Sequence, residues 1–312
     1  MKTVILCEKK MNFDGSMDFS TLTEEVSSYP DADPEKFLER IQGADILVTK
    51  ENPVTGEMIS AMPSSLKLIV EAGTGYNNID IKAAAERGIT VCNVPAYSTD
   101  RVAETAVMLM LCLASSMQKQ LRMLERGDRS NFTEHLKVPH FELLGKALGI
   151  IGYGRIGRKT AEICRAMGMK IITYSRTQRY SDVEYVSLKD LLGQSDFISL
   201  HCPLTDATRH IIGSEALAAM KPSAFLINTS RGALIDEEAL IEALRNGSIA
   251  GAALDVQETE PPEGSNPLYE MDNVIITPHM GWKGYETRQR LLSIIREDID
   301  GFRSGNTVNK VN

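Results

Sequence analysis

Short apolar runs alternate with segments of helical periodicity over nearly the whole chain. This alternation is typical of βαβ units, in which parallel strands are joined by helices that cover the faces of a sheet. At roughly 150 residues per domain, a chain of 312 residues predicts two domains rather than one. The expected fold class is therefore α/β, with two doubly wound parallel-sheet domains.

The first part of the chain is expected to form a small doubly wound domain over residues 1–99. The last helical segment, residues 285–302, follows the end of the second sheet, so we expect it to cross back to the first domain. That domain would then be discontinuous and completed by residues 285–312. Its expected strands are residues 3–7, 45–49, 67–70 and 89–92, with helices near residues 34–41 and 79–87.

A long apolar helix is expected over residues 101–125, at the start of a second domain that spans residues 100–284. Such a helix belongs either in a core or at a subunit interface, and the sequence alone leaves both readings open. The expected strands of this domain are residues 147–151, 170–174, 196–200, 224–228, 250–255 and 274–277. This strand number is the one found in a complete dinucleotide-binding sheet.

Composition excludes several classes of protein. Hydrophobic residues make up 43% and charged residues 24%, as in ordinary globular proteins. The formal net charge of −8 argues against nucleic acid as a partner, because such binding rests on clustered Lys and Arg. The longest apolar stretch, residues 106–114, falls short of the ~20 residues that a membrane span needs.

The N-terminus and the cysteines point to the cytosol as the expected location. The first apolar run is interrupted at Glu8, Lys9 and Lys10, so it lacks the full apolar region of a signal peptide. The 5 cysteines are odd in number, widely spaced and without a CxxC pair. Neither a disulfide framework nor a metal site is therefore expected.

A glycine-rich loop follows the strand expected at residues 147–151. Gly152, Gly154 and Gly157 fit the pattern G-x-G-x-x-G, with Arg155 and Ile156 between them and a helix directly after them. The first glycine permits a tight turn, the second lets a pyrophosphate approach the backbone, and the third allows the helix to pack closely on the strand. In this context the loop predicts dinucleotide binding rather than a structural turn.

The residues after the next strand bear on which dinucleotide binds. An NAD enzyme usually places an acid there for the ribose 2′-hydroxyl. This chain has Ser175, Arg176 and Thr177 instead, and the first acid is Asp182. Hydroxyl donors and a guanidinium suit a 2′-phosphate, so NADP(H) is favoured over NAD(H). The alternative is that Arg176 stacks on the adenine and NAD is still used.

Three polar groups follow later strands of the second sheet, at the edge where ligands bind in such folds. Arg231 offers a planar fork for a carboxylate, and His279 can donate and accept a proton. Glu260 is a carboxylate that would favour the protonated imidazole. Each residue alone is commonly an ion pair or a packing residue. Together they predict reduction of a 2-oxo acid, in which His279 gives a proton to the carbonyl oxygen as hydride reaches the carbon.

Two long segments, residues 191–208 and 220–236, resemble signatures of the D-isomer-specific 2-hydroxyacid dehydrogenases, and the resemblance covers almost the entire chain. It implies a Rossmann domain inserted into a smaller flavodoxin-like substrate domain, and a homodimer built on the helix at residues 101–125. It also agrees with catalytic roles for Arg231, Glu260 and His279. Further cofactor-binding residues implied are Cys202, Pro203, Thr208, Thr229, Ser230, Asp255 and Gly281, and further substrate-binding residues are Lys50, Gly73, Thr74, Gly75 and Trp282.

Within that family, the stretch from His279 through Trp282 looks most like the glycerate dehydrogenase or hydroxypyruvate reductase branch. The resemblance implies hydroxypyruvate/glycerate or glyoxylate/glycolate as the favoured substrate pairs. The chain departs from the pattern of the family at two places. Ser175 and Arg176 stand where NAD-using members have an Asp, and Gln257 stands where an aromatic residue is common.

Two other readings remain open at this point. A formate-type dehydrogenase on the same fold takes hydride from formate without any proton transfer. Glu260 argues against that reaction, because a carboxylate beside His279 suits acid/base catalysis. A nucleotide-sensing module that binds protein partners would keep the site while acting by association. Its expected mark is long appended tails, and this chain has only a few residues beyond Phe302.

Overall fold

The computed structural model describes residues 1–262 and 264–312. The chain divides into two compact units, of which the first comprises Met1–Ser98 with Trp282–Asn312 and the second comprises Thr99–Gly281. The first unit is thus discontinuous, and Trp282 belongs to it although the sequence suggested a boundary at residue 284. Among the described residues, no helix combines the length and apolarity needed to cross a membrane.

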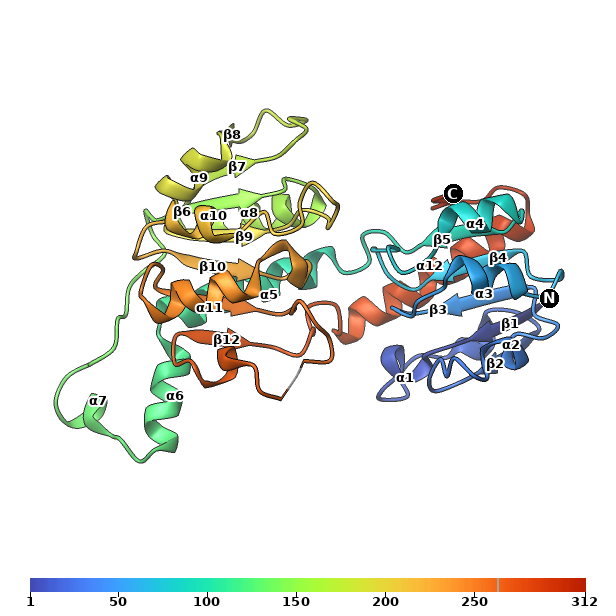
Figure 1. The fold of residues 1–312 in the computed structure, drawn as a ribbon, viewed down its shortest axis with the longest axis horizontal. Helices are drawn as coiled ribbons and strands as arrows, with labels where there is room; N and C mark the ends of the chain where they lie inside the picture. The colour runs from blue at the N-terminus through green and yellow to red at the C-terminus, as the bar shows by residue number, and fades with distance from the viewer. Residues whose placement is uncertain (263) are drawn as a thin grey trace. The chain divides into compact units, whose positions relative to one another are not determined.

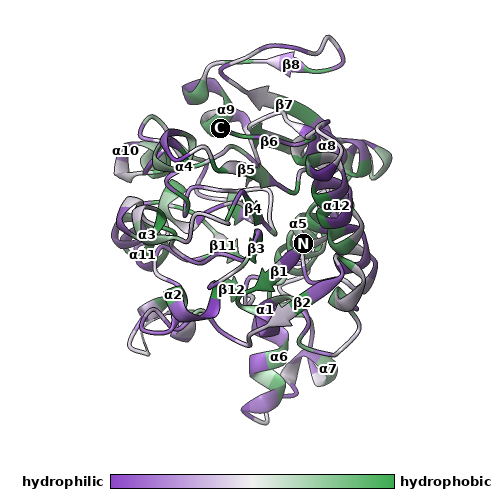
Figure 2. Cartoon of the chain, turned by 90° about the vertical axis from the view of Figure 1, so that its right-hand side faces the viewer, coloured by the Kyte–Doolittle hydropathy of each residue, from purple (hydrophilic) through white to green (hydrophobic). Residues whose placement is uncertain are grey.

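The first unit is a sheet of parallel strands in the order β2-β1-β3-β4-β5, the order of flavodoxin-like folds. β2 was missed by the sequence analysis because Glu25-Val-Ser-Ser is a polar edge strand. Figure 2 accordingly draws β1 in green beside a paler β2. The strands are β1 (Lys2–Ile5), β2 (Glu25–Ser28), β3 (Ile46–Thr49), β4 (Leu68–Glu71) and β5 (Thr90–Asn93). The helices are α1 (Glu8–Met11), η1 (Phe19–Thr21), α2 (Phe37–Arg40), α3 (Gly56–Ala61), α4 (Ile81–Glu86) and α12 (Tyr285–Arg303).

Alternation along these strands builds a core on each face of the first sheet. Ile46 and Val48 pack with Leu291 and Ile295 of α12 on one face. Leu47 packs on the other face, with residues of α2, α3 and α4. Helix α12, far along the chain from these strands, therefore packs on this face together with α1 and η1 (Figure 1).

The second unit is a parallel sheet in the order β12-β11-β10-β9-β6-β7-β8. Counted from its own first strand, this is the Rossmann order 3-2-1-4-5-6 with one strand added. The strands are β6 (Ala147–Ile151), β7 (Lys170–Tyr174), β8 (Glu184–Tyr185), β9 (Phe197–Leu200), β10 (Phe225–Asn228), β11 (Gly251–Leu254) and β12 (Val274–Ile276). The helices are α5 (Thr99–Ala114), α6 (Met117–Glu125), α7 (Ser130–Thr133), α8 (Arg155–Ala166), α9 (Leu188–Gln194), α10 (Ser214–Ala218), η2 (Gly232–Leu234), α11 (Glu237–Arg245) and η3 (Pro267–Glu270).

The expectation of one uninterrupted helix over residues 101–125 is wrong. Ser116 adopts a left-handed conformation, with φ 48°, and its hydroxyl donates a hydrogen bond to the Pro139 carbonyl at 2.6 Å. The chain therefore forms α5 and α6 separately. Helix α5 is buried against the sheet, whereas α6 has no buried residue and is tied to the segment after β11 by Arg122, which donates to the Tyr269 and Glu270 carbonyls (Figure 1).

Candidate active site

The glycine-rich loop lies between β6 and α8, where the strand order of the second sheet reverses. Gly152 has φ 98°, and a side chain there would collide with the backbone of Cys202. A side chain at Gly157 would collide with the Gly152 carbonyl. Both positions therefore require glycine for the protein's own packing, and the loops after β6 and β9 touch each other.

Gly154 is different because the protein itself does not require glycine there. Its φ of −84° suits any residue, and a Cβ would have no heavy atom within 4 Å. Gly154 is also the N-cap of α8, which no side chain caps. The open space before a helix N-terminus, next to Arg155 and Ile156, fits the approach of a phosphate group.

The residues after β7 present positive charge without compensation. Arg176 and Thr177 are exposed, and Arg176 has no ion-pair partner among the residues the structure describes. The nearest following acid, Asp182, accepts a hydrogen bond from the Tyr153 hydroxyl at 3.2 Å and lies 3.5 Å from Arg165. The Asp182 carboxylate is therefore already paired with Tyr153 and Arg165. The polar residues at the end of β7 are Ser175, Arg176 and Thr177.

Two buried polar atoms lack hydrogen-bond partners among the described residues at the carboxyl edge of this sheet. They are Nδ1 of His201, after β9, and Oγ1 of Thr229, after β10. Burial lowers the pKa of His201 to about 4, so its ring is neutral near pH 7. Unpaired polar atoms are costly in a protein interior, and their position fits a polar ligand lying along this edge. Beyond His201, the turn at Cys202 and Pro203 is closed by Thr208, whose hydroxyl donates to the Pro203 carbonyl at 2.7 Å.

Arg231 follows β10 in a turn fixed by its neighbours. The Asn228 amide donates to the Arg231 carbonyl at 2.8 Å, and the Ser230 hydroxyl donates to the Leu200 carbonyl at 3.0 Å. A side chain at Gly232 would collide with the backbone of Gln257, so this turn packs directly on the loop after β11. The half-buried Arg231 guanidinium has no ion-pair partner in the described part of the chain.

Asp255, at the end of β11, organises the loop that carries His279. Its carboxylate accepts hydrogen bonds from the Thr277 hydroxyl at 2.6 Å and from the N–H groups of Met280 and Gly281 at 2.8 Å each. Its carbonyl accepts from the His279 N–H at 2.9 Å, and His279 adopts φ 47°. The Asp255 carboxylate is thus occupied in holding this loop, a role that the family resemblance alone did not indicate.

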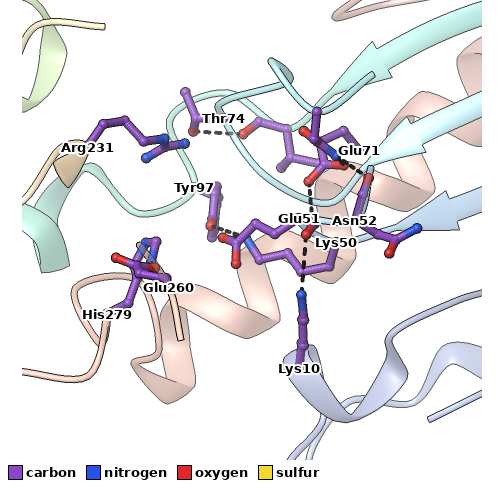
Figure 3. Close-up of polar contacts among 12 residues, drawn as sticks. Lys10, Lys50, Glu51, Asn52, Glu71, Thr74, Tyr97, Arg231, Glu260 and His279 are labelled. Carbon is purple, nitrogen blue, oxygen red and sulfur yellow. Dashed lines mark hydrogen bonds and ion pairs between the residues drawn. The ribbon is translucent and has the colours of Figure 1, made fainter. Parts of the chain in front are cut away.

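The His279 imidazole lies against the Glu260 carboxylate (Figure 3). Nδ1 of His279 is 2.7 Å from Oε2 of Glu260, and Oε1 of Glu260 accepts from the Gln257 N–H at 2.9 Å. The two side chains are 24% and 34% exposed. A cavity of about 310 Å³ adjoins them, lined by Asp255, Gln257, Glu260, Pro261, Pro262, Tyr269, Ile276, Thr277, Pro278 and His279.

In the first unit, residues 73–75 form a loop tied to the end of β5. The Thr74 hydroxyl donates to the Val94 carbonyl at 3.1 Å, and the Asn93 amide donates to the Thr74 carbonyl at 2.7 Å. The N–H groups of Thr74 and Gly75 donate no hydrogen bond within the described residues. Two adjacent free N–H groups are the feature that binds an anion in such loops.

Lys50 and Trp282 also meet in the first unit. The Lys50 ammonium is 4.1 Å from the Trp282 ring centroid and 3.5 Å from the Tyr97 hydroxyl. Glu51 lies 2.9 Å from the same ammonium. The sequence analysis named Lys50 and Trp282 but not Glu51 or the buried Glu71 below them, because only the folded sheet places these acids beside the ammonium.

Comparisons with known proteins agree with this arrangement. Residues 107–281 match the family described as D-isomer specific 2-hydroxyacid dehydrogenase, NAD binding domain. A hydroxypyruvate reductase of Blautia hydrogenotrophica is 39% identical over 286 residues, covering 90% of this chain and 88% of the relative. A glyoxylate reductase of Thermococcus litoralis is 42% identical over 286 residues, covering 88% and 86%.

The fold is also similar to that of a solved acyclic imino acid reductase in complex with NADPH and D-Arg. The two share 29% identity and a TM-score of 0.86, with all of both chains covered. The sequence similarity extends through both units. The chain therefore belongs to the D-isomer-specific 2-hydroxyacid dehydrogenase family.

Proposed function

We propose that this protein uses NADPH to reduce hydroxypyruvate or glyoxylate to the corresponding D-2-hydroxy acid. The observation that carries the proposal is the His279–Glu260 pair at 2.7 Å, held at the carboxyl edge of a Rossmann sheet. Its oxidoreductase class follows from the family. The substrates are inferred from the names of the two relatives, and the residue roles from the geometry.

His279 acts as the proton donor in this proposal. Its Nδ1 is engaged with Glu260, which leaves Nε2 to give a proton to the carbonyl oxygen of the substrate. The Glu260 carboxylate holds Nδ1 and fixes the orientation of the ring. Asp255 holds the loop in which His279 sits and does not itself exchange a proton.

Arg231 binds the substrate carboxylate. Its guanidinium is half-buried and has no acidic partner among the described residues, so a bidentate carboxylate would complete its hydrogen bonds. In the first unit, the adjacent N–H groups of Thr74 and Gly75 are donors of the kind that bind a carboxylate. Arg231 thereby orients the substrate for transfer.

The dinucleotide would supply the hydride when bound. Gly154 and the N-terminus of α8 would receive its pyrophosphate, with Arg155 and Ile156 contributing backbone N–H groups. The preference for NADPH rests on Ser175, Arg176 and Thr177 after β7 and on the engagement of Asp182 elsewhere. The similar imino acid reductase was solved with NADPH.

We further propose that two copies associate through α6. Leu121 and Leu124 on this helix are 49% and 45% exposed, and Phe132 in α7 is 78% exposed. Figure 2 shows α6 as a mixture of hydrophobic and hydrophilic segments. Exposed apolar side chains on neighbouring segments are typical of an association surface, and the family resemblance points to α6.

The test is the initial rate of absorbance loss at 340 nm with hydroxypyruvate, glyoxylate, pyruvate and a branched 2-oxo acid, each with NADPH and with NADH. We expect the first two acids with NADPH to be the best combinations. His279→Ala and Arg231→Ala should lower turnover by about 100-fold or more while leaving NADPH binding nearly unchanged. Normal turnover in either variant would exclude the assigned roles.

The same assay also tests whether the protein is a nucleotide-binding module rather than an enzyme. If no oxo acid is reduced with either cofactor while NADPH binding is tight, the protein retains the dinucleotide site without the reaction. The Glu260 carboxylate beside His279 favours catalysis, because a binding module has no need for an imidazole held in a fixed orientation.

A further inference from the structure

Gln257 lies directly beside the His279–Glu260 pair, in the loop after β11. Its N–H donates to Oε1 of Glu260 at 2.9 Å, and Oε2 of the same carboxylate is 2.7 Å from Nδ1 of His279. The family resemblance leads us to expect an aromatic side chain at this position, so the amide of Gln257 is a particular feature of this chain. Its contacts show what the amide does.

The Gln257 amide is paired with Tyr269 of η3. The Tyr269 hydroxyl accepts a hydrogen bond from the Gln257 amide nitrogen at 2.9 Å and lies 3.0 Å from the amide oxygen. Both side chains line the cavity of about 310 Å³ that adjoins Glu260 and His279. The backbone of Gln257 packs on Gly232, where a Cβ would collide with it. Gln257 is thus held by its backbone on the turn after β10 and by its side chain on η3.

The segment that carries Tyr269 is itself anchored to helix α6. Arg122 of α6 donates to the Tyr269 carbonyl at 2.8 Å and to the Glu270 carbonyl at 2.9 Å. The same guanidinium donates to the Asp272 carboxylate at 2.9 Å. The Arg122 side chain is 17% exposed, whereas that of Arg126, which also donates to Asp272, is 63% exposed. Arg122 therefore fixes the segment 269–272 to α6 at three points.

A continuous series of hydrogen bonds thus leads from α6 to the imidazole, entirely within the second unit. Its members, in order, are Arg122, Tyr269, Gln257, Glu260 and His279. Residues 258–260 are exposed, so this part of the loop has little packing to hold it. Hydrogen bonds from the neighbouring segments are what restrict the position of the carboxylate.

We propose that Tyr269 and Gln257 are positioning residues that hold the Glu260 carboxylate against His279, with Arg122 as their anchor on α6. The proposal rests on the proposed function, because it takes His279 as the proton donor. Proton transfer requires the donor to be aligned with the acceptor, and a small displacement costs a large factor in rate. Tyr269 acts through Gln257 and Glu260, so its loss slows the chemical step and leaves substrate and cofactor affinity unchanged.

The first variant is Tyr269→Phe, which keeps the ring and removes the hydroxyl. The measurement is the single-turnover rate of NADPH oxidation with hydroxypyruvate, together with the KM for hydroxypyruvate and the Kd for NADPH. We expect the rate to fall about three- to tenfold, as for the loss of one hydrogen bond, with both affinities unchanged. Gln257→Leu should have the same effect. Tyr29→Phe, whose ring faces Arg40 in the first unit, is the control.

A double variant distinguishes positioning from a general loss of structure. In Glu260→Ala the side chain that Tyr269 is proposed to hold is gone, so adding Tyr269→Phe should lower the rate no further. If Tyr269→Phe alone leaves the rate unchanged, the proposal is overturned. It is also overturned if Tyr269→Phe lowers the rate by the same factor with and without the Glu260 side chain.

The anchor on α6 is tested by a pair of arginines. Arg122→Met removes the donors to both carbonyls and should lower the same rate about threefold or more, whereas Arg126→Met removes only a partner of Asp272 and should not. Melting temperatures show that the variants fold, and light scattering shows whether their mass is unchanged. Equal rates in the two variants overturn the role of Arg122. Absence of turnover with every 2-oxo acid in the wild-type protein overturns the proposed function, and this proposal with it.

Discussion

Nδ1 of His279 lies 2.7 Å from Oε2 of Glu260, and the second oxygen of that carboxylate is held by the Gln257 N–H. The carboxylate is therefore fixed from both sides, and it holds one face of the imidazole by direct contact. The imidazole and the acid come from loops after different strands, β12 and β11, so the sheet itself sets their separation.

Replacing Glu260 by Gln should lower kcat by about tenfold or more, because the His279 ring loses the carboxylate that holds Nδ1 and orients Nε2. The measurement is kcat together with NADPH binding, which should stay nearly unchanged. Glu258→Gln, two residues earlier and paired with His210 at 2.9 Å, is the matched control. An equal fall of kcat in both variants would contradict a specific role for Glu260.

Replacing Ser175 by Asp should move cofactor preference toward NADH. A carboxylate at the end of β7 would repel a 2′-phosphate and accept hydrogen bonds from a ribose 2′-hydroxyl. We expect the NADPH to NADH ratio of kcat/KM to fall about tenfold or more. Arg176→Ala should raise the KM for NADPH, whereas Arg245→Ala, an exposed arginine on α11, should not. An unchanged ratio in Ser175→Asp would count against 2′-phosphate recognition at this position.

Alanine at Gly154 should weaken dinucleotide binding, whereas alanine at Gly157 should lower the stability of the fold. The space around Gly154 is open, so Gly154→Ala should fold normally while its KM for the dinucleotide rises. A methyl group at Gly157 would collide with the Gly152 carbonyl, so Gly157→Ala should lose about 1–3 kcal/mol of stability. Thermal unfolding and cofactor titration of both variants give the comparison. Equal loss of stability would show that Gly154 is needed for packing.

Asp298 should make stability depend on pH. Burial raises the pKa of Asp298 to about 7, and one of its oxygens has no partner among the described residues. A raised pKa means that the folded protein holds a proton that the unfolded chain has released. The contribution is therefore fully present below about pH 4 and is lost as pH rises toward 7 and beyond.

Asp298→Asn should remove that loss, because the amide cannot ionise and its oxygen can still accept from Asn309. The melting temperature of this variant should exceed that of the wild-type protein at pH 8, by more than it does at pH 5. The control is Asp300→Asn, an exposed residue of the same helix. If Asp298→Asn melts lower than the wild-type protein at both pH values, the packing of the carboxyl group outweighs its charge.

A charge on α6 should dissociate the proposed dimer. Leu121→Asp places a carboxylate among the exposed apolar side chains of that helix, where burial would be costly. Light scattering after size exclusion should change from the mass of two chains to that of one. Leu38→Asp on α2 introduces the same charge in the first unit and should leave the mass unchanged. A wild-type monomer would exclude the proposal outright.

Strand positions were predictable where the periodicity was strong. The bounds expected for β6 and β7 agree with the structure, because both strands are apolar runs between clear turn signals. The two-residue strand β8 and the polar edge strand β2 carry no such signal. The break at Ser116 was also unpredictable, since neither Gly nor Pro marks it and the left-handed turn depends on a distant carbonyl at Pro139.

The residues of the site were predictable to the extent that they follow strands. Arg231, Glu260 and His279 lie after β10, β11 and β12, and parallel strands bring their carboxyl ends to one edge. The enclosure of Lys50 by Glu51 and Glu71 was not predictable. It depends on adjacent strands β3 and β4 meeting in register, which places Thr49 beside Glu71.

The position of α12 sets the order in which the chain can fold as it is synthesised. The second unit is continuous in sequence from Thr99 to Gly281, so all of its strands leave the ribosome together. One face of the first sheet must wait for Leu291 and Ile295, which are synthesised after the whole second unit. Domains usually form in the order of their synthesis. Here the N-terminal strands stay incompletely covered until α12 has been made, and the unit begun first is completed second.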